Sequence, residues 1–455
     1  MAEKFDTIVI GGGPGGYVAA IRSAQLGRKT ALVERDKVGG RCLNYACIPA
    51  KTMLRSAELY DNLRGAAELG VVAGDLAIDW EALGRRRAGV SVKVSGGVGF
   101  LLGKNKVTVI EGSGSLTADG DVAVAGDVYE AGLVILATGS VALPIPGADF
   151  GGRVVDTWGA WSLPELPRKI AVVGCGSSGT ELASAYIRFG TEVLIFEAID
   201  QILPAEDLEM SKVVERAFRR QGIEISTGTP VRNVEASADS VRFTYGENSA
   251  EVDYLCIAGG RAPDVEGLGL AEAGIELEAS RRVKVDEYGQ TTNRKVFAIG
   301  DLVRGKALAH KASEEGVFAV ERALGVDTHP VDQRLIVGAT FTHPQVASVG
   351  LTEAQAREAG YEVKIGKQKL SAEGAGVVYD DKEGLVKLVV DARTGEILGA
   401  HMVGDRACDM IAELVATMAI EGGYQELERV VHPHPTASEA ILDAARAVDG
   451  WAIHA

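Results

Sequence analysis

The stretch Thr7–Gly16, TIVIGGGPGG, carries the strongest information about the architecture. A short β-branched run leads directly into a loop of glycines, and a helical pattern of apolar residues follows before a second strand at Thr30–Glu34. Strand, loop, helix and strand in this order form a βαβ unit. The glycines Gly11, Gly13 and Gly16 match G-x-G-x-x-G, the pattern that lets a backbone approach the pyrophosphate of a dinucleotide at a helix N-terminus.

The same arrangement recurs further along the chain. The strand Ile170–Val173 leads into the loop GCGSSG, and a helical pattern and another strand follow. The matching glycines of this loop are Gly174, Gly176 and Gly179. In both copies a glutamate, Glu34 or Glu197, lies eighteen residues after the third glycine, where it can accept hydrogen bonds from an adenosine ribose. Two such units predict two bound dinucleotides.

The acidic end of the second unit indicates the type of nicotinamide nucleotide. The carboxylate of Glu197 suits a free 2′-hydroxyl and repels a 2′-phosphate. The next residues, Ala198 and Ile199, supply no arginine to hold such a phosphate. We therefore expect NAD and not NADP at this unit.

Two later apolar strands, Leu255–Ala258 and Val296–Ile299, have no glycine loop of their own. We expect them to complete sheets that begin earlier, which implies that one nucleotide domain is inserted into the other. From about Gly338 the pattern changes, because the strands Leu385–Asp391 and Glu396–Gly404 flank a short turn and an amphipathic helix follows. This part of the chain predicts an α+β module with an antiparallel sheet.

Composition excludes several classes of function. The net charge of −16 makes nucleic acid an unfavourable partner and an anionic membrane surface a poor one. No run of 18 apolar residues is present, so we expect no membrane span. The first strand begins too early for a leader peptide, which favours a cytoplasmic protein, or a mitochondrial matrix protein whose leader was removed. Five cysteines are too few for a disulfide scaffold.

Two of these cysteines, Cys42 and Cys47, lie close together in the segment GGRCLNYACIPAK of residues 39–51. Cysteines five apart at a helix start can bridge if the local turn is distorted. A helix N-terminus and the nearby Lys51 both lower a thiol pKa. A pair of structural thiols is the alternative. A metal site needs more ligands, and no other Cys/His pair at ligand spacing lies beside them, so we expect no metal.

The segment resembles the redox-disulfide helix of the flavoprotein pyridine nucleotide-disulfide oxidoreductases, particularly the dihydrolipoamide dehydrogenase branch. The resemblance implies that Cys42 is the interchange thiol and that Cys47 forms a charge-transfer thiolate over the flavin. It implies that Lys51 lies near flavin N5 and that Glu181 pairs with the lysine near the nicotinamide site.

Other marks of that family are present. VFAIGD, residues 296–301, resembles its second FAD motif, and LAHKA, residues 308–312, resembles the helix start below the flavin pyrimidine. The resemblance implies the following cofactor-binding residues for FAD and NAD: Gly11, Gly13, Pro14, Gly15, Gly16, Glu34, Arg35, Gly40, Arg41, Lys51, Gly114, Thr138, Gly139, Ser140, Asp301, Ala307, Leu308, Ala309, His310, Gly174, Gly176, Ser177, Ser178, Gly179, Glu197, Val231 and Gly260.

Near the C-terminus the segment HPTASE, residues 434–439, resembles the family's catalytic signature. A histidine and a glutamate at this spacing, His434 and Glu439, can form a base and its orienting carboxylate. His432 lies outside the core motif and is a supporting candidate only. The resemblance implies that His434 reaches the disulfide of the other subunit, so that the site forms in a homodimer.

The implied fold class is α/β, with two Rossmann-like dinucleotide-binding domains, the NAD domain inserted in the FAD domain, and a C-terminal α+β dimerisation domain. We expect boundaries at residues 1–144 and 265–337 for the FAD domain, 145–264 for the NAD domain and 338–455 for the dimerisation domain.

The implied activity is NAD⁺-dependent oxidation of protein-bound dihydrolipoyl groups. The carriers would be 2-oxoacid dehydrogenase complexes, the glycine cleavage system or another lipoate-binding protein. A glutathione-type reductase would use NADPH, which Glu197 disfavours. Mercuric reductase would have an extra C-terminal cysteine pair, whereas Cys408 is alone. Another FAD-dependent disulfide reductase and a non-catalytic flavoprotein scaffold are the remaining alternatives.

The segment also departs from the family pattern. Ala46, Ala50 and Arg41 replace smaller or hydroxylated residues, and Ser177 with Ser178 replaces a bulky pair in the second loop. We expect altered flavin contacts and a less gated nicotinamide pocket, but no loss of a catalytic group.

Overall fold

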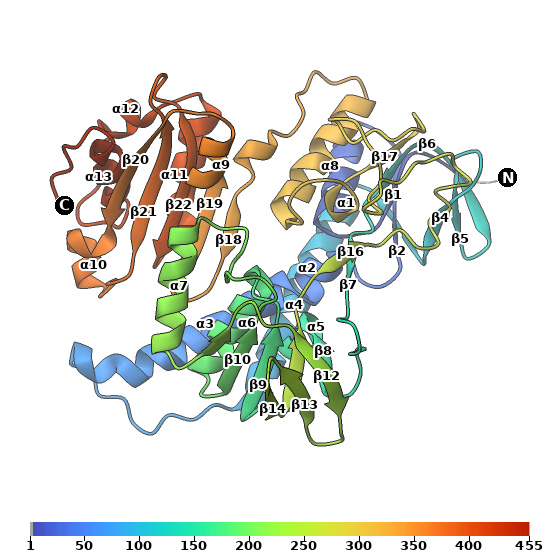
Figure 1. The fold of residues 1–455 in the computed structure, drawn as a ribbon. Coiled ribbons are helices and arrows are strands. Elements are labelled where there is room, and N and C mark those ends of the chain that lie inside the picture. Colours follow the sequence, from blue (N-terminus) through green and yellow to red (C-terminus); the bar gives the residue numbers. More distant parts are fainter. Residues whose placement is uncertain (1–2, 455) are drawn as a thin grey trace. The chain divides into compact units, whose positions relative to one another are not determined.

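The protein is described by a computed structural model that covers residues 3–454 (Figure 1). The chain forms two compact units. The first contains the residues up to Thr52 together with Asp79–Leu143 and Gly260–Gln333. The second contains Met53–Ile78, Pro144–Gly259 and the chain from Arg334 onward. The chain therefore leaves the first unit and later returns to it, as the sequence indicates for an inserted nucleotide domain.

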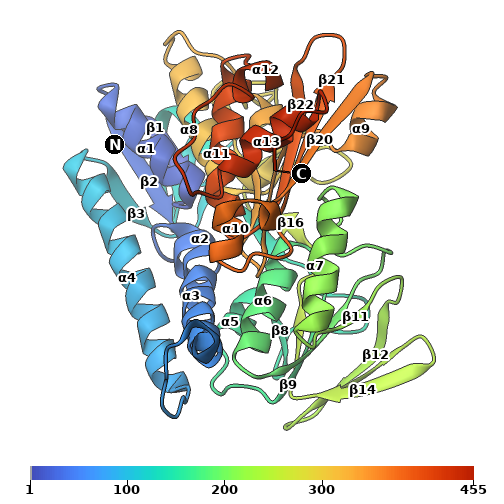
Figure 2. The ribbon, with the colours of Figure 1, turned by 90° about the vertical axis from the view of Figure 1, so that its left-hand side faces the viewer.

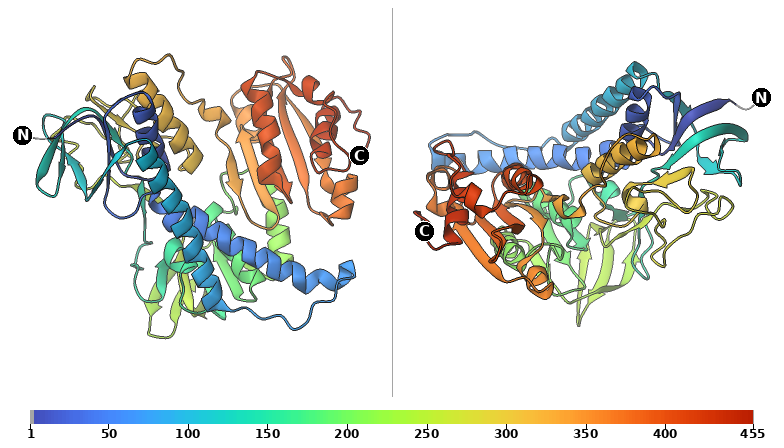
Figure 3. Two further views of the ribbon diagram at one scale, coloured as in Figure 1. Left: turned by 180° about the vertical axis from the view of Figure 1, so that it is seen from behind. Right: turned by 90° about the horizontal axis from the view of Figure 1, so that it is seen from above.

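The first unit is built on a mainly parallel sheet. The parallel strands run in the order β3 (Thr108–Glu111), β2 (Thr30–Glu34), β1 (Lys4–Ile10), β6 (Asp127–Leu136) and β17 (Val296–Ala298). The late strand β17 thus completes the first sheet, as expected. The strands β5 (Val122–Val124) and β4 (Gly114–Leu116) add an antiparallel extension to β6. The helices α1 (Pro14–Gln25) and α8 (Ala309–Ala323) lie side by side on this sheet (Figure 3).

Three further helices belong wholly or partly to the first unit. The helix α2 (Gly40–Asn44) is followed by α3 (Cys47–Gly65), and α4 (Trp80–Lys104) begins at an N-cap in which Asp79 accepts a hydrogen bond from the Ala82 N–H. Ser95 on α4 donates to the Asn44 side chain at 2.8 Å, which joins α4 to α2. A two-stranded ribbon pairs β7 (Ser140–Ala142) with β16 (Arg261–Pro263).

The second unit contains another parallel sheet. Its strands run in the order β11 (Glu224–Ser226), β10 (Glu192–Phe196), β9 (Lys169–Val173), β15 (Tyr254–Ile257) and β8 (Val154–Asp156). The helices α5 (Thr157–Trp161), α6 (Ser177–Arg188) and α7 (Leu208–Arg220) accompany it (Figure 2). An antiparallel sheet of β12 (Val231–Ala236), β13 (Val241–Tyr245) and β14 (Asn248–Val252) packs through Phe243 against Phe196, with ring centroids 5.3 Å apart.

The C-terminal part of the second unit is an antiparallel sheet with helices, as the sequence predicts. The strands run in the order β18 (Gly338–Thr340), β19 (Gln345–Gly350), β22 (Ile397–Gly404), β21 (Leu385–Asp391) and β20 (Val363–Lys369). The helix α11 (Ala407–Ala419) packs on β19 and β22, and α13 (Glu439–Ala447) packs on β20 and β21 (Figure 2). The shorter helices are α9 (Glu353–Glu358), α10 (Gly374–Val378) and α12 (Tyr424–Leu427).

A buried ion cluster ties this antiparallel module to α7 inside the second unit. The side chain of Lys387 on β21 is only 2% exposed. Its ammonium lies 3.1 Å from Asp207, 2.7 Å from Glu209 and 2.9 Å from Glu353. Burial lowers the pKa of Lys387, but hydrogen bonds and charge from the three carboxylates raise it above the ordinary value.

Candidate active site and cofactor loops

The first glycine loop requires glycine at its tightest positions. Gly11 has φ +102°, in the left-handed region, and a Cβ there would lie 2.7 Å from the Ala137 carbonyl carbon. A Cβ on Gly16 would overlap the Gly11 carbonyl oxygen. A Cβ on Gly13 would meet nothing within 4 Å, so the loop has an open face at the N-terminus of α1. An open backbone at a helix start suits a pyrophosphate.

The carboxylate of Glu34 organises this loop. Its Oε2 accepts a hydrogen bond of 2.6 Å from the Gly12 N–H, and its Oε1 accepts one of 2.9 Å from the Asp36 N–H. A ribose hydroxyl can donate to the same carboxylate. The expected acidic residue therefore lies at the end of β2, in contact with the glycine loop.

A polar network surrounds Asp301, the aspartate of the second expected FAD motif. Asp301 accepts a hydrogen bond from Ser140 and forms an ion pair with Arg261 at 3.3 Å. Behind it, the Gly300 N–H donates to Glu315 at 2.8 Å, and the buried Lys311 forms an ion pair with Glu315 at 2.7 Å. Lys311 lies inside the expected LAHKA motif and Arg261 follows the expected Gly260, but the sequence did not single out either side chain, and Glu315 was missed. The i,i+4 spacing of Lys311 and Glu315 was an available signal.

Two other expected cofactor residues contact Asp264, which sequence reasoning also missed. The Thr138 hydroxyl donates to the Asp264 carbonyl at 2.7 Å, and Arg35 forms an ion pair with its carboxylate at 2.5 Å. Gly114 begins β4, where a Cβ would lie 3.1 Å from the side chains of both Ile10 and Val33. Close packing against Ile10 and Val33 therefore favours glycine at position 114.

The second glycine loop follows β9 and leads into α6. Gly174 has φ +102°, and a Cβ there would lie 2.6 Å from the Ala258 carbonyl. A Cβ on Gly179 would overlap the Gly174 carbonyl oxygen, whereas one on Gly176 would meet nothing within 4 Å. Glu197 accepts from the Cys175 N–H at 2.8 Å and from the Ala198 N–H at 2.8 Å. The second carboxylate therefore holds its loop as Glu34 holds the first.

Two residues on α6 contact the antiparallel module of the same unit. Ser177 accepts a hydrogen bond from Thr340 on β18 at 2.8 Å. Glu181 is 5% exposed and accepts from the Phe341 N–H at 2.9 Å. One of the two serines that replace the expected bulky pair is thus engaged by a hydroxyl of β18, while Ser178 is exposed. Two further residues are expected at this nucleotide. Val231 begins β12, and Gly260 immediately precedes β16.

The thiol pair lies where the helix is interrupted. Cys42 is in α2 and Cys47 begins α3, with Tyr45 and Ala46 between the two helices. This break supplies the distorted turn that a bridge requires. The segment also reaches the first loop, because the Gly39 N–H donates to the Gly12 carbonyl at 2.7 Å.

The electrostatics of the thiol pair are asymmetric. The hydrogen bond to Cys47 and burial raise the pKa of the Cys42 thiol, while Lys51 lowers it. The Cys42 thiol is therefore harder to ionise than an isolated cysteine.

The C-terminal motif brings His434 and Glu439 together. The imidazole Nδ1 lies 2.9 Å from Glu439 Oε1, and Glu439 Oε2 accepts from the Thr436 N–H at 2.8 Å. The His434 side chain is 75% exposed, whereas Glu439 is 17% exposed. Burial raises the pKa of Glu439, but the hydrogen bonds from Thr436 and His434 hold it below its ordinary value. An ionised carboxylate thus orients an accessible imidazole.

The neighbouring His432 has a different environment. Its side chain is 4% exposed, and its Nε2 lies 2.8 Å from Glu413 on α11. The His432 imidazole is therefore much less accessible than that of His434.

Comparison with known proteins identifies the family. Residues 5–316 match the pyridine nucleotide-disulphide oxidoreductase family, and residues 336–445 match its dimerisation domain. The chain belongs to this family. Dihydrolipoyl dehydrogenases of Bacillus subtilis (40% identical) and Zymomonas mobilis (41% identical) are similar to it over 100% of both chains. That of Thermus scotoductus is 41% identical over 99% of each chain.

Solved structures of family members resemble the whole chain. LpdA of Mycobacterium tuberculosis superimposes with a TM-score of 0.89 at 27% identity, covering 97% of this chain and 99% of that one. The HOCl-induced flavoprotein disulfide reductase RclA of Escherichia coli gives a TM-score of 0.87 at 27% identity, with the same coverage. Both confirm the expected fold class of two nucleotide-binding domains and a dimerisation domain.

The cofactors of this oxidoreductase family, FAD and NAD, fit the two glycine loops. Each loop has an open glycine face at a helix start and a ribose-type carboxylate beside it. The dimerisation domain supports a homodimer. Among residues 3–454, no helix combines the length and apolar character needed to cross a bilayer.

Proposed function

We propose that this chain oxidises dihydrolipoyl groups carried by other proteins and reduces NAD⁺. Full-length similarity to dihydrolipoyl dehydrogenases supports the substrate class. The observation that carries the proposal is the thiol pair at the break between α2 and α3, beside the first glycine loop. The accessible His434–Glu439 pair supplies the base that a thiol substrate requires.

In the oxidised enzyme Cys42 and Cys47 form a disulfide. The His434 imidazole removes the proton from one substrate thiol, because the thiolate is the reactive form. The substrate thiolate attacks Cys42 Sγ, so a substrate–Cys42 bond forms and the Cys42–Cys47 bond breaks. Cys47 leaves as a thiolate.

The second substrate thiol then attacks the substrate sulfur of the mixed disulfide. Its bond to Cys42 breaks, lipoyl disulfide is released, and Cys42 takes up a proton. The substrate has lost two electrons and two protons. The thiol pair has gained the two electrons, one proton is on Cys42, and the other is on His434. The residues of the two glycine loops would hold FAD and NAD⁺, and these cofactors, when bound, would supply the two-electron acceptor for the reduced Cys42/Cys47 pair.

We propose that the first loop, with Glu34, Asp301 and the helix start at 307–310, holds FAD. The second loop, with Glu197, holds NAD. Lys51 is positioned near the flavin, and Glu181 near the nicotinamide. The remaining expected cofactor residues belong to the same two sites. Glu34 and Glu197 each accept a hydrogen bond from an amide of their glycine loop, which supports these assignments.

We further propose that His434 of one subunit serves the disulfide of its partner in the homodimer. Its 75% exposure in the single chain is consistent with work at a subunit boundary. The lipoyl carriers are 2-oxoacid dehydrogenase complexes, the glycine cleavage system or another lipoate-binding protein. Because the full-length relatives are bacterial, we place the reaction in the cytoplasm.

Stopped-flow measurement of the two half-reactions tests the proposal. His434→Gln should keep FAD and the dimer but slow reduction by dihydrolipoamide by about 10²–10⁴-fold, the usual contribution of a general base. Reduction by NADH should remain near the wild-type rate. The exposed His329, changed to Gln, is the matched control and should affect neither. Equal slowing of both halves in His434→Gln would make that histidine structural and direct attention to His432.

The thiol roles need a separate measurement. Cys42→Ser should show a thiolate–flavin absorbance band from Cys47 without any reduction, because this variant keeps the thiol that we propose lies over the flavin. Cys47→Ser should not show the band. The opposite pattern would reverse the roles.

A further inference from the structure

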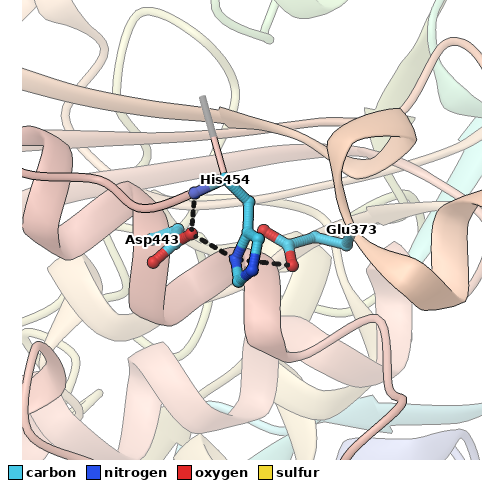
Figure 4. A group of neighbouring side chains, drawn as sticks. All are labelled: Glu373, Asp443 and His454. Atoms are coloured by element: carbon cyan, nitrogen blue, oxygen red, sulfur yellow. Dashed lines mark hydrogen bonds and ion pairs between the residues drawn. The ribbon is translucent and has the colours of Figure 1, made fainter.

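A second cluster of titratable side chains lies outside the thiol and histidine pairs (Figure 4). Glu373 precedes α10, Asp443 is on α13, and His454 follows that helix near the chain end. His454 Nδ1 lies 3.0 Å from Asp443 Oδ2 and 3.7 Å from Glu373 Oε2. The three possible ligand atoms all lie within 4.8 Å of one another.

The burial of this cluster differs from that of an ordinary acidic surface patch. The Glu373 and Asp443 side chains are 3% and 2% exposed, whereas His454 is 57% exposed. The two carboxylates are thus removed from solvent, and the imidazole leaves a route for a small ion. Buried carboxylates are normally paired with a cation or bound to a metal.

Each carboxylate has one oxygen fixed by a neighbouring donor. Gln368 Nε2 donates to Glu373 Oε1 at 2.7 Å, and the Arg446 guanidinium donates to Asp443 Oδ1 at 3.1 Å. The other oxygens, Glu373 Oε2 and Asp443 Oδ2, face His454 (Figure 4). Outer partners that orient ligands in this way are typical of metal sites.

The inner oxygens differ in their partners. Asp443 Oδ2 accepts from the His454 backbone N–H at 2.9 Å as well as facing the imidazole. Within residues 3–454, Glu373 Oε2 accepts no hydrogen bond and has only the 3.7 Å ion pair.

We propose that Glu373, Asp443 and His454 form a binding site for a divalent first-row metal ion such as Zn²⁺. Three protein ligands with one open position is a common zinc arrangement, and bonds of about 2.0–2.2 Å place tetrahedral ligand atoms about 3.3 Å apart. The observed 3.0 and 3.7 Å bracket that spacing. The ion replaces the proton between Nδ1 and Oδ2, and its two positive charges match the two carboxylates.

The proposed metal site also adjoins the segment that contacts the proposed base, His434. Glu373 continues into Gly374, where a Cβ would lie 3.6 Å from His434 Cε1. Asp443 is one helical turn after Glu439 on α13. An ion there fixes the segment that faces His434 and acts as a positioning element, while the proton transfer remains with His434.

Calorimetric titration of the full-length holoenzyme with Zn²⁺ tests the site. The protein is treated with EDTA, dialysed without reductant so that Cys42 and Cys47 remain a disulfide, and titrated alongside variants. Wild type and the matched histidine control His329→Gln should bind one ion per chain at this site. His454→Ala and Glu373→Gln should lose that binding, by more than about 100-fold in affinity. Gln368→Leu should weaken it by about 10–100-fold, the usual cost of an outer partner.

Thermal melting provides a second readout. Saturating Zn²⁺ should raise the Tm of wild type and His329→Gln but not that of His454→Ala, because ligand binding to the native state alone stabilises it. His454 is near the chain end, so this variant folds even if a buried substitution does not. Absence of Zn²⁺ binding in wild type, or unchanged affinity and Tm shift in His454→Ala, would overturn the metal site and leave the cluster as a hydrogen-bonded contact between α13 and the segment before α10.

Discussion

The loop Gly11–Gly16 and the loop Gly174–Gly179 have nearly the same backbone. The first glycine has φ +102° in both, and the third would clash with the carbonyl of the first if it carried a Cβ. In each loop one glutamate accepts a hydrogen bond from the amide that follows the first glycine. The shared positions are therefore set by the turn itself and by the ligand that the turn faces.

The loops also differ at the fifth position, Gly15 in the first loop and Ser178 in the second. A Cβ on Gly15 would lie 2.8 Å from the Ala312 carbonyl, because α8 packs closely on α1. The equivalent Ser178 is exposed. Beside it, Ser177 meets Thr340 of β18 through a hydroxyl. The neighbouring helix α8 therefore accounts for the glycine at this position in the first loop.

The strongest test of the shared positions is to change the third glycine of each loop. Gly16→Ala should lower the stability of the first unit by about 3 kcal/mol or more, at the upper end of overpacking costs, and abolish flavin retention. Gly179→Ala should keep flavin but lose reduction by NADH. Flavin absorbance of the purified proteins and stopped-flow with NADH would measure both. If both variants retained flavin and NADH reduction, the close approaches would not be required.

The two glutamates separate the cofactor preferences of the loops. A 2′-phosphate about 4 Å from Glu197 would cost about 1–4 kcal/mol, so kcat/KM should favour NAD⁺ over NADP⁺ by about 10-fold or more. Glu197→Gln should reduce this preference, whereas Glu34→Gln, measured on flavin-loaded protein, should leave it unchanged. Equal kcat/KM for the two nucleotides in wild type would refute the assignment.

Substitution at the fifth position should affect stability only in the first loop. Gly15→Ala forces the Ala312 carbonyl to move and should cost about 1–3 kcal/mol in the free energy of unfolding. Ser178→Ala, on an exposed site, should stay within about 0.5 kcal/mol. Denaturant titration measures both, and a neutral Gly15→Ala would mean that α1 and α8 can separate without cost.

The smallest expected effect concerns the second position, Gly12 in one loop and Cys175 in the other. Burial and the charge of Glu197 raise the pKa of Cys175, so its thiol stays protonated and unreactive at neutral pH. Iodoacetamide at pH 8 should leave Cys175 unlabelled in the native enzyme while labelling the reduced Cys42/Cys47 pair. Peptide mass spectrometry would show the pattern, and rapid labelling of Cys175 would contradict its buried environment.

Local patterns predicted the nucleotide-binding parts of the fold well. The strands at β1, β2, β9 and β10 were predicted because an apolar run, a glycine loop and an acidic residue follow one another within a short stretch. The late strand β17 pairs with β6 and β15 pairs with β9, which confirms that they complete earlier sheets. Boundaries differed by a few residues, and α6 begins at Ser177, earlier than its first clearly helical residue in the sequence.

Other elements could not be read in this way. The helix α4 contains Gly96, Gly97, Gly99 and Gly103, and glycine disfavours a helix, so the local preference opposes the structure. Packing of α4 on α2 overrides that preference. The contacts of Asp301 with Ser140 and Arg261 join residues far apart in sequence, and no spacing rule predicts them.

In the candidate site too, contacts within one short motif were predicted and contacts between distant segments were not. The pairing of His434 with Glu439 was predicted because both belong to one short motif. The partner of His432 was not predicted, since Glu413 lies on another helix. Motifs thus locate groups that act locally, while groups that are held by distant segments need the folded chain.

The burial of Lys387 limits how this protein can be recombined with its relatives. Of its three carboxylate partners, Asp207 and Glu209 come from the start of α7, and only Glu353 comes from the same antiparallel module. In a chimaera that exchanged the module at Arg334, a host without carboxylates at the positions of Asp207 and Glu209 would leave the desolvated ammonium with Glu353 alone, and removing a partner from a buried ion pair is destabilising. A functional exchange must therefore include the antiparallel module together with the start of α7, although the two are far apart in the sequence.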